Sequence, residues 1–142
     1  DWQRVIDVNL MSAYYASRAA IPHLVAAGGG KIINVGSGMG HQAKAGNAAY
    51  NVSKAGLWML TRCLALELWE QGIDVNELVP GPVYTDLTSD IFRPPGEAAP
   101  HLADSERVKT PAECAPLALF IATQGPGGPT GQSFSLARRP IM

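Results

Sequence analysis

Two residues spaced four apart have side chains of types that suggest chemistry. Tyr50 and Lys54 stand at positions i and i+4, so in a helix their side chains project from the same face. A phenol is ordinarily a poor acid or base at neutral pH, but an ammonium one helical turn away stabilises the phenolate. The spacing therefore predicts that Tyr50 serves as a general acid or base, although a Tyr-xxx-Lys match is weak when taken alone.

A serine at a second place strengthens this interpretation. Ser37 follows the apolar run Ile32–Val35, which predicts a strand, and open α/β sheets place their ligand sites past the carboxyl ends of strands. A serine hydroxyl beside Tyr50 can donate a hydrogen bond to a carbonyl oxygen, where negative charge gathers as hydride arrives. The three residues together predict reduction of a carbonyl group, or the reverse oxidation of an alcohol.

The elements that position these residues follow from hydrophobic periodicity and from breaker residues. Helices are predicted from Trp2 to about Ala27, from about Ala48 to Gln71, and from a capping box at Thr110 to about Thr123. Buried strands are predicted over 31–35 and 73–79, and a last strand over 131–136. The polar, proline-containing stretch 83–109 is too long for a simple connector and is predicted to be a substrate lid.

Strands that alternate with helices predict an α/β fold with right-handed crossovers and a parallel sheet covered on both faces. Three strands form only the C-terminal portion of a doubly wound Rossmann fold, so residues 1–142 are expected to be a single partial domain. The sequence opens at Asp1 inside an amphipathic pattern. We therefore expect that the N-terminal βαβ half is missing from it.

Composition excludes several classes of function. The chain has 142 residues, 46% of them hydrophobic, and a formal net charge of −1, which fits one core and argues against nucleic acid as a partner. No apolar run approaches the length of a membrane span, so a cytoplasmic protein without a membrane partner is expected. Cys63 and Cys114 lack metal-site spacing and are predicted to be reduced core residues, and no metal is expected.

Five segments, in order, resemble the signatures of short-chain dehydrogenases/reductases, and the resemblance covers nearly the whole chain. They are Asp7-Val8-Asn9-Leu10, Ile33-Asn34-Val35-Gly36-Ser37, Tyr50-Asn51-Val52-Ser53-Lys54, Val75-Asn76 and Pro80-Gly81-Pro82-Val83-Tyr84-Thr85. In overall appearance the chain is most similar to the members that reduce 3-oxoacyl carrier-protein thioesters. The resemblance implies an oxidoreductase that transfers a hydride between NAD or NADP and an alcohol or carbonyl substrate.

The resemblance also implies a role for each matching residue. Ser37, Tyr50 and Lys54 would be the catalytic triad, and Asn9 would hold a water that links Lys54 to solvent. Lys54, together with Tyr50, would also bind the nicotinamide ribose.

Further positions would line the cofactor, the substrate and a second subunit. Pro80 and Gly81 would lie along the nicotinamide, Val83 would offer its backbone to the carboxamide, and Thr85 would offer its hydroxyl to the carboxamide or pyrophosphate. Ser37, Met39 and His41 would contact the substrate, and His101 in the lid is a further candidate. The helices over 2–27 and 48–71 would pack in a homodimer or homotetramer.

Two departures and two alternatives stand beside this interpretation. Gly36 replaces a serine that many relatives carry, and Glu77 occupies a strand position where relatives usually have a small residue, so a buried carboxylate there would need a partner. The chain could instead be a non-catalytic fragment or oligomerisation module that lacks the cofactor-binding half. A sugar epimerase or dehydratase would use the same Tyr and Lys, but the short tail after the last strand argues against it.

Overall fold

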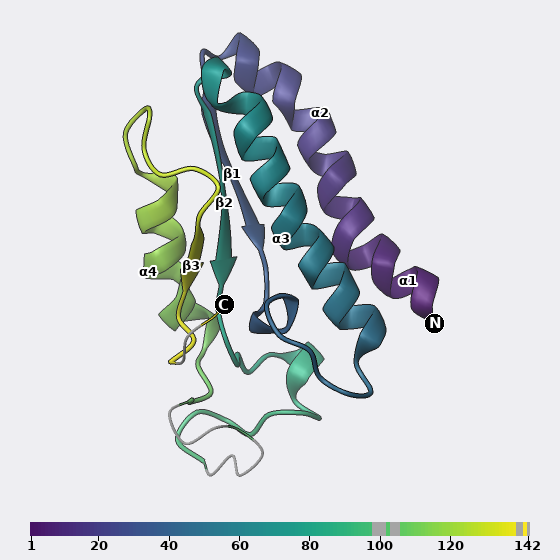
Figure 1. Ribbon diagram of the computed structural model, residues 1–142. Coiled ribbons are helices and arrows are strands. Elements are labelled where there is room, and N and C mark those ends of the chain that lie inside the picture. Colours follow the sequence, from purple (N-terminus) through teal and green to yellow (C-terminus); the bar gives the residue numbers. More distant parts are fainter. Residues whose placement is uncertain (98–101, 103–105, 139–140, 142) are drawn as a thin grey trace.

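The computed structural model describes residues 1–97, 102, 106–138 and 141, and its elements alternate as the sequence predicts (Figure 1). The helices are α1 (Trp2–Ile6), α2 (Ser12–Ala26), α3 (Ala48–Leu68) and α4 (Pro111–Ala122), with a π-helical turn η1 (Asp7–Met11) and the 3-10 turns η2 (Gly38–Gly40), η3 (Trp69–Gln71) and η4 (Asp86–Thr88). The strands are β1 (Gly30–Val35), β2 (Ile73–Val79) and β3 (Ser133–Ser135).

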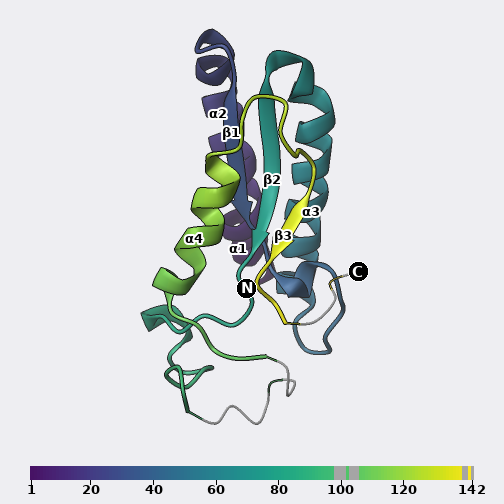
Figure 2. The same cartoon turned by 90° about the vertical axis from the view of Figure 1, so that its left-hand side faces the viewer.

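The three strands form one parallel sheet in the order β1-β2-β3. Helices α2 and α3 cover one face, with α1 beside α3 on that side, and α4 covers the other face, as two views at right angles agree (Figures 1 and 2). Parallel strands with helices on both faces confirm the predicted fold class, a portion of a doubly wound sheet. The carboxyl ends of β1 and β2 therefore lie at the same edge of the sheet, where Ser37 and Pro80 follow them.

The two crossovers have opposite hands. The strands step in one direction from β1 to β3, yet α3 and α4, which connect them, lie on opposite faces of the sheet (Figure 2). One crossover must therefore be left-handed, and the prediction that both are right-handed was wrong. Residues 80–110, between β2 and α4, form a connection long enough to carry the chain to the other face.

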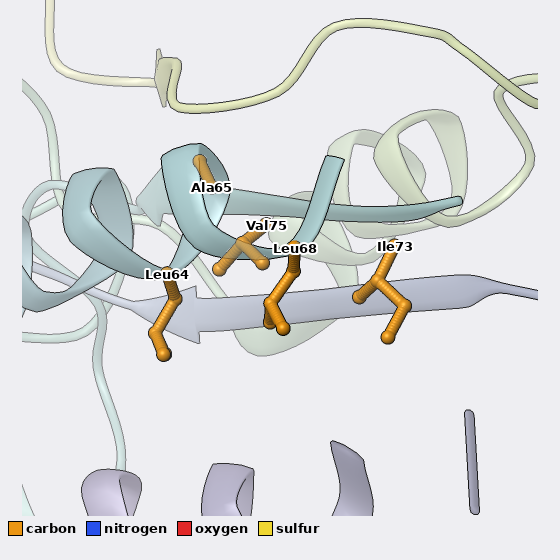
Figure 3. Packing of buried hydrophobic residues seen from close by; sticks show 5 residues of the cluster. All are labelled: Leu64, Ala65, Leu68, Ile73 and Val75. Carbon is orange, nitrogen blue, oxygen red and sulfur yellow. The ribbon is translucent and has the colours of Figure 1, made fainter. Parts of the chain in front are cut away.

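The core lies between α3 and the middle of the sheet. Leu64, Ala65 and Leu68 from α3 pack on Ile73 and Val75, which are alternate residues of β2 and share one face of the sheet (Figure 3). Fully burying an aliphatic side chain of this size contributes about 1.5–3 kcal/mol, so this contact fixes α3 on the sheet. Every residue of β2 is buried, as predicted for the strand over 73–79.

Two burial predictions were wrong. Strand β1 is only half-buried and Val35 is 55% exposed, because β1 pairs with β2 alone within the part of the chain that the structure describes. Cys63 is exposed because it lies on α3 away from the side that packs on the sheet, although both cysteines are free as predicted. Among the described helices, none combines the length and the apolar character that crossing a membrane requires.

Candidate active site

Tyr50 and Lys54 lie on the first two turns of α3, where the helix reaches the carboxyl end of β1. The ammonium Nζ of Lys54 donates a hydrogen bond to the Val35 carbonyl oxygen at 3.0 Å and lies 5.9 Å from the centroid of the Tyr50 ring. Tyr50 is 37% exposed, whereas Lys54 is half-buried. Lys54 thus links the helix to the last residue of β1 and keeps a positive charge close to the phenol ring.

Two opposing effects act on the charge of Lys54. Burial lowers the pKa of the Lys54 ammonium below its usual value of 10.5, because the charged form loses hydration, and the Glu77 carboxylate acts against this effect. Burial is the larger of the two. The charge that would stabilise a phenolate at Tyr50 is therefore itself costly in the fold.

Ser37 is positioned by a tight turn directly after β1. It occupies the N-cap of η2 in an extended conformation, and its Oγ accepts a hydrogen bond from the backbone N–H of Met39 at 3.1 Å. A hydroxyl that accepts in this way retains its own hydrogen for donation. The turn thus fixes the Ser37 oxygen while leaving its hydrogen available for a substrate oxygen.

The loop after Ser37 is docked on α3 beside the candidate pair. The side-chain amide of Asn51 donates to the carbonyl oxygens of Met39 and Gln42, both at 2.6 Å. Gly40 lies so close to α3 that a Cβ added there would be 2.7 Å from the carbonyl carbon and oxygen of Lys54. The structure therefore brings Ser37, Met39, Tyr50 and Lys54 into one region.

Asn9 lies in the π-helical turn η1, which the sequence did not predict. The turn packs closely on α3, since a Cβ added at Gly56 would lie 2.8 Å from Cδ2 of Leu10. Single π-helical turns inside helices are frequent at functional sites. The structure thus places half-buried Asn9 on a turn that contacts the helix of Lys54, and its link through water stays a prediction.

The segment Pro80–Thr85 follows β2 at the same edge of the sheet. Gly81 has a φ of +70°, a left-handed conformation that favours glycine, and a bridge pairs Val83 with Lys109. The Val83 carbonyl oxygen accepts from the Thr88 hydroxyl at 2.7 Å, and Thr85 caps η4 with its hydroxyl 3.0 Å from that of Thr88. The segment is thus held by the chain itself, and its contacts to a cofactor stay predictions.

His41 and Glu77 form a buried pair that the sequence analysis missed. Nε2 of His41 lies 2.9 Å from Oε2 of Glu77, and the same oxygen accepts a hydrogen bond from the Ser133 hydroxyl at 2.5 Å. The His41 side chain is 4% exposed and packs against Trp58, with ring centroids 5.0 Å apart. The predicted substrate contact at His41 stays untested, but its imidazole is turned inward to Glu77.

The sequence marks Glu77 as needing a partner but cannot identify it. His41 is 36 residues away and Ser133 is 56 residues away, so no local pattern connects them to Glu77. The sequence offered one signal for the position of the Glu77 side chain. Gly36 is smaller, and Glu77 larger, than the residues that relatives usually carry at these positions. The folded structure places the two positions next to each other, since a Cβ added at Gly36 would lie 2.5 Å from Cδ of Glu77.

Two further predictions concern metal and the lid. Within the described ranges, no three His, Cys, Asp or Glu side chains gather in a way that could hold a metal ion. His101, the lid candidate for a substrate contact, lies outside the described residues, as does part of the predicted lid 83–109. The role of that stretch stays a prediction.

Known proteins share both the sequence pattern and the fold of this chain. Residues 1–136 match a family model described as enoyl-(acyl carrier protein) reductase. The chain is 39% identical, over 87% of its length, to the 3-oxoacyl-[acyl-carrier-protein] reductase FabG of Chlamydia pneumoniae, of which it covers 50%. It is 32% identical, over 96% of its length, to the acetoacetyl-CoA reductase of Cupriavidus necator, of which it covers 55%.

A solved structure of the same architecture agrees with these sequence relatives. The gluconate 5-dehydrogenase of Burkholderia cenocepacia, solved in complex with NADP and tartrate, superposes with a TM-score of 0.84 at 26% identity, covering 96% of this chain and 55% of that one. The chain belongs to the short-chain dehydrogenase/reductase family. It spans about half the length of these relatives.

Proposed function

We propose that this chain carries the catalytic residues of an NAD(P)-dependent oxidoreductase that interconverts an alcohol and a carbonyl compound. One observation supports this proposal above all others: Lys54 bridges Val35 and the Tyr50 ring, while the Ser37 loop docks on the same helix. The relatives named above are reductases and dehydrogenases, which is the same class of reaction.

The residues around Lys54 fit a nicotinamide cofactor. An ammonium has three hydrogens to donate, and within the described residues Lys54 is hydrogen-bonded to the Val35 carbonyl alone, which leaves donors for the ribose hydroxyls. The segment with Pro80, Gly81, Val83 and Thr85 lies at the edge of the sheet where doubly wound folds bind dinucleotides. When bound there, NAD or NADP would supply or take up the hydride.

The chain itself would handle the proton. In reduction, the Tyr50 hydroxyl donates its proton to the substrate oxygen, and in oxidation the phenolate takes a proton from the substrate hydroxyl. The Lys54 ammonium stabilises that phenolate, and the Ser37 hydroxyl donates a hydrogen bond to the substrate oxygen as charge builds on it. Asn9 would hold a water through which Lys54 exchanges protons with solvent.

The substrate would enter between the Ser37 loop and the lid over 83–109, with Met39 and His41 on the loop side. Two of the relatives are named for 3-oxoacyl and acetoacetyl thioesters. A 3-oxoacyl thioester is therefore the first substrate class to test.

A second copy of the chain would pack on α3. Val52, Met59 and Leu66 are exposed and recur at seven-residue spacing along this helix, a pattern typical of a helix that packs against another helix. Tyr14 and Tyr15 on α2 are also exposed. These side chains support the proposed homodimer or homotetramer.

Replacing Tyr50 with Phe tests the function directly. In the full-length protein, Tyr50→Phe should lower kcat for a 3-oxoacyl thioester by about 100-fold or more, because the proton donor is lost. The exposed Tyr15→Phe is the matched control: it keeps the aromatic ring that the proposed interface would use, lies on α2 and not in the proposed active site, and should leave turnover unchanged. Circular dichroism and calorimetric titration with NADH and NADPH would show that both variants still fold and bind cofactor.

Two outcomes would contradict the proposal. An active Tyr50→Phe enzyme would remove Tyr50 from the proton transfer. A full-length wild-type protein that binds neither NADH nor NADPH would contradict the proposed NAD(P)-dependent reaction.

A further inference from the structure

Glu77 is a charged residue type at a fully buried position in the centre of the sheet. Its Oε2 is bonded to His41 from the loop after β1 and to Ser133 from β3, whereas in the described part of the chain Oε1 has no hydrogen-bond partner. A buried carboxylate is costly, and apolar side chains in such positions are often equally or more stabilising. Packing alone therefore does not account for a glutamate here.

Gly36 provides the space that the Glu77 side chain occupies. A Cβ added at Gly36 would lie 2.5 Å from Cδ of Glu77 and closer still to its Oε1. Gly36 is the residue after Val35, whose carbonyl oxygen holds the Lys54 ammonium at 3.0 Å. The carboxyl group thus lies against the same short piece of backbone that anchors Lys54.

The surroundings of Glu77 contain few other charges. Helix α3 contributes Lys54, the loop contributes His41, and β3 contributes the uncharged Ser133. Trp58 packs on the His41 ring, and the Arg62 guanidinium lies 5.3 Å from the Trp58 ring centroid on α3. Glu77 acts on Lys54 by opposing the effect of burial on its pKa.

We propose that Glu77 is a positioning residue for the active site, where it anchors the His41 loop behind Ser37 and Met39 and stabilises the Lys54 ammonium beside Tyr50. This inference rests on the proposed function, because it assigns Glu77 a part in the reaction of Tyr50 and Lys54. Glu77 does not touch the substrate. It acts through His41 and Lys54.

Glu77→Gln tests the electrostatic part, since glutamine keeps the shape and removes the charge. In full-length protein labelled with 13C-lysine, the Lys54 signal is assigned by its loss in Lys54→Arg and followed by NMR from neutral to alkaline pH. Without the carboxylate, burial acts alone, so the Lys54 titration should move to lower pH in Glu77→Gln. The alkaline limb of the pH profile of kcat should move in the same direction, with little change in KM.

The exposed Glu67→Gln on α3 is the matched control and should change neither the NMR titration nor the pH profile. An unchanged Lys54 titration in Glu77→Gln would overturn the proposed effect on Lys54. If the NMR titration moves but the protein has no turnover, the proposed function fails while the electrostatic effect of Glu77 on Lys54 stands.

A double-mutant cycle tests the packing of Glu77 against Gly36, which holds the carboxyl group in place to anchor the loop, without any activity assay. Gly36→Ala should lower the urea midpoint because its Cβ meets the Glu77 side chain, and Glu77→Ala should lower it by leaving His41 and Ser133 without their partner. In the double variant the new methyl group occupies the space that the Glu77 side chain has vacated. The fall in the urea midpoint of the double variant should therefore be smaller than the sum of the falls in the two single variants. Strictly additive losses would show that the two positions do not compete for space and would overturn the packing described above.

Discussion

Lys54 is the residue at which stability and chemistry oppose each other. Its ammonium is held on the Val35 carbonyl in a half-buried position, and burial lowers its pKa because the charged form is less hydrated in the folded protein than in the unfolded chain. The same charge is what the proposed reaction needs beside Tyr50. The buried charge of Lys54 thus lowers the free energy of unfolding, while the proposed reaction requires that charge.

Lys54→Met should therefore separate the two properties. We expect kcat/KM to fall by about 100-fold or more, while the free energy of unfolding at neutral pH stays equal or rises. The sign follows from the lowered pKa: the wild type gains stability as pH rises from that folded-state pKa towards 10.5, because the unfolded chain then holds more protons. The stability difference between variant and wild type should shrink over that interval, as urea unfolding at several pH values would show.

The exposed loop residue Lys44 offers the control, since Lys44→Met removes the same charge from a solvated position. It should change neither activity nor the pH dependence of unfolding. A Lys54→Met variant that is strongly destabilised at neutral pH would contradict the assigned cost of the buried charge.

At this scale the sequence predicted the part of the site that depends on local spacing. Tyr50 and Lys54 share a helix face, and Ser37 follows a strand, and both features can be predicted from periodicity. The pair of His41 and Glu77 depends on three segments meeting in space, the loop, β2 and β3, and no period encodes that. The sequence could only report that a carboxylate on a buried strand needs a partner.

At the scale of elements, the site depends on how closely the η2 turn approaches α3. Asn51 holds the turn through two carbonyl oxygens, and Gly40 lets the backbone of the turn reach the backbone of Lys54. Backbone atoms of a helix cannot move aside as a flexible side chain can. The distance between the turn and the helix thus sets where Ser37 stands relative to Tyr50.

Gly40→Ala should consequently impair the site without replacing any of the proposed catalytic residues. The added methyl group would force the turn away from α3, and overpacking of this kind costs about 1–3 kcal/mol. We expect lower stability in urea and a lower kcat. The control is Gly125→Ala, where a Cβ meets nothing within 4 Å, and it should leave both quantities nearly unchanged.

Most elements could be predicted because their signals are local. The capping box at Thr110 and Glu113 begins α4 as predicted, and Gly72, in the left-handed conformation, ends the helical stretch after α3. The π-helical turn at Asp7–Met11 has no such signal, because one extra residue in a helix leaves the hydrophobic period almost unchanged. The opposite hands of the crossovers also follow from tertiary packing and not from any motif.

At the scale of the whole molecule, an exposed stripe on α3, formed by Val52, Met59 and Leu66, predicts association of two copies. Leu66 is 77% exposed on that stripe, whereas Leu87 is 90% exposed on the η4 turn, away from the helices. In the full-length protein, Leu66→Glu should weaken the oligomer, because a charge would be buried at the contact. Light scattering at several concentrations measures the effect, and Leu87→Glu is the matched control.

A full-length protein that is monomeric at all concentrations, or a Leu66→Glu variant that assembles as the wild type does, would remove α3 from the interface. Retained activity in a monomeric Leu66→Glu variant would further show that assembly and chemistry are independent.

The backbone edge of β1 that is unpaired among the described residues gives these 142 residues, taken on their own, a second way to associate. Its backbone pairs with β2 on one side only within the described chain, and Val35 stands exposed at its end. Main-chain groups along such a margin accept almost any extended peptide, since they recognise no side chain. Contact between the same helices of two copies, or between their two β1 edges, is two-fold and closes on itself. Addition of the β1 edge of one copy to the β3 edge of another is head-to-tail and can repeat. Particles that keep growing in size, and do not stop at a fixed size, would show that association occurs by strand addition and not by contact between helices.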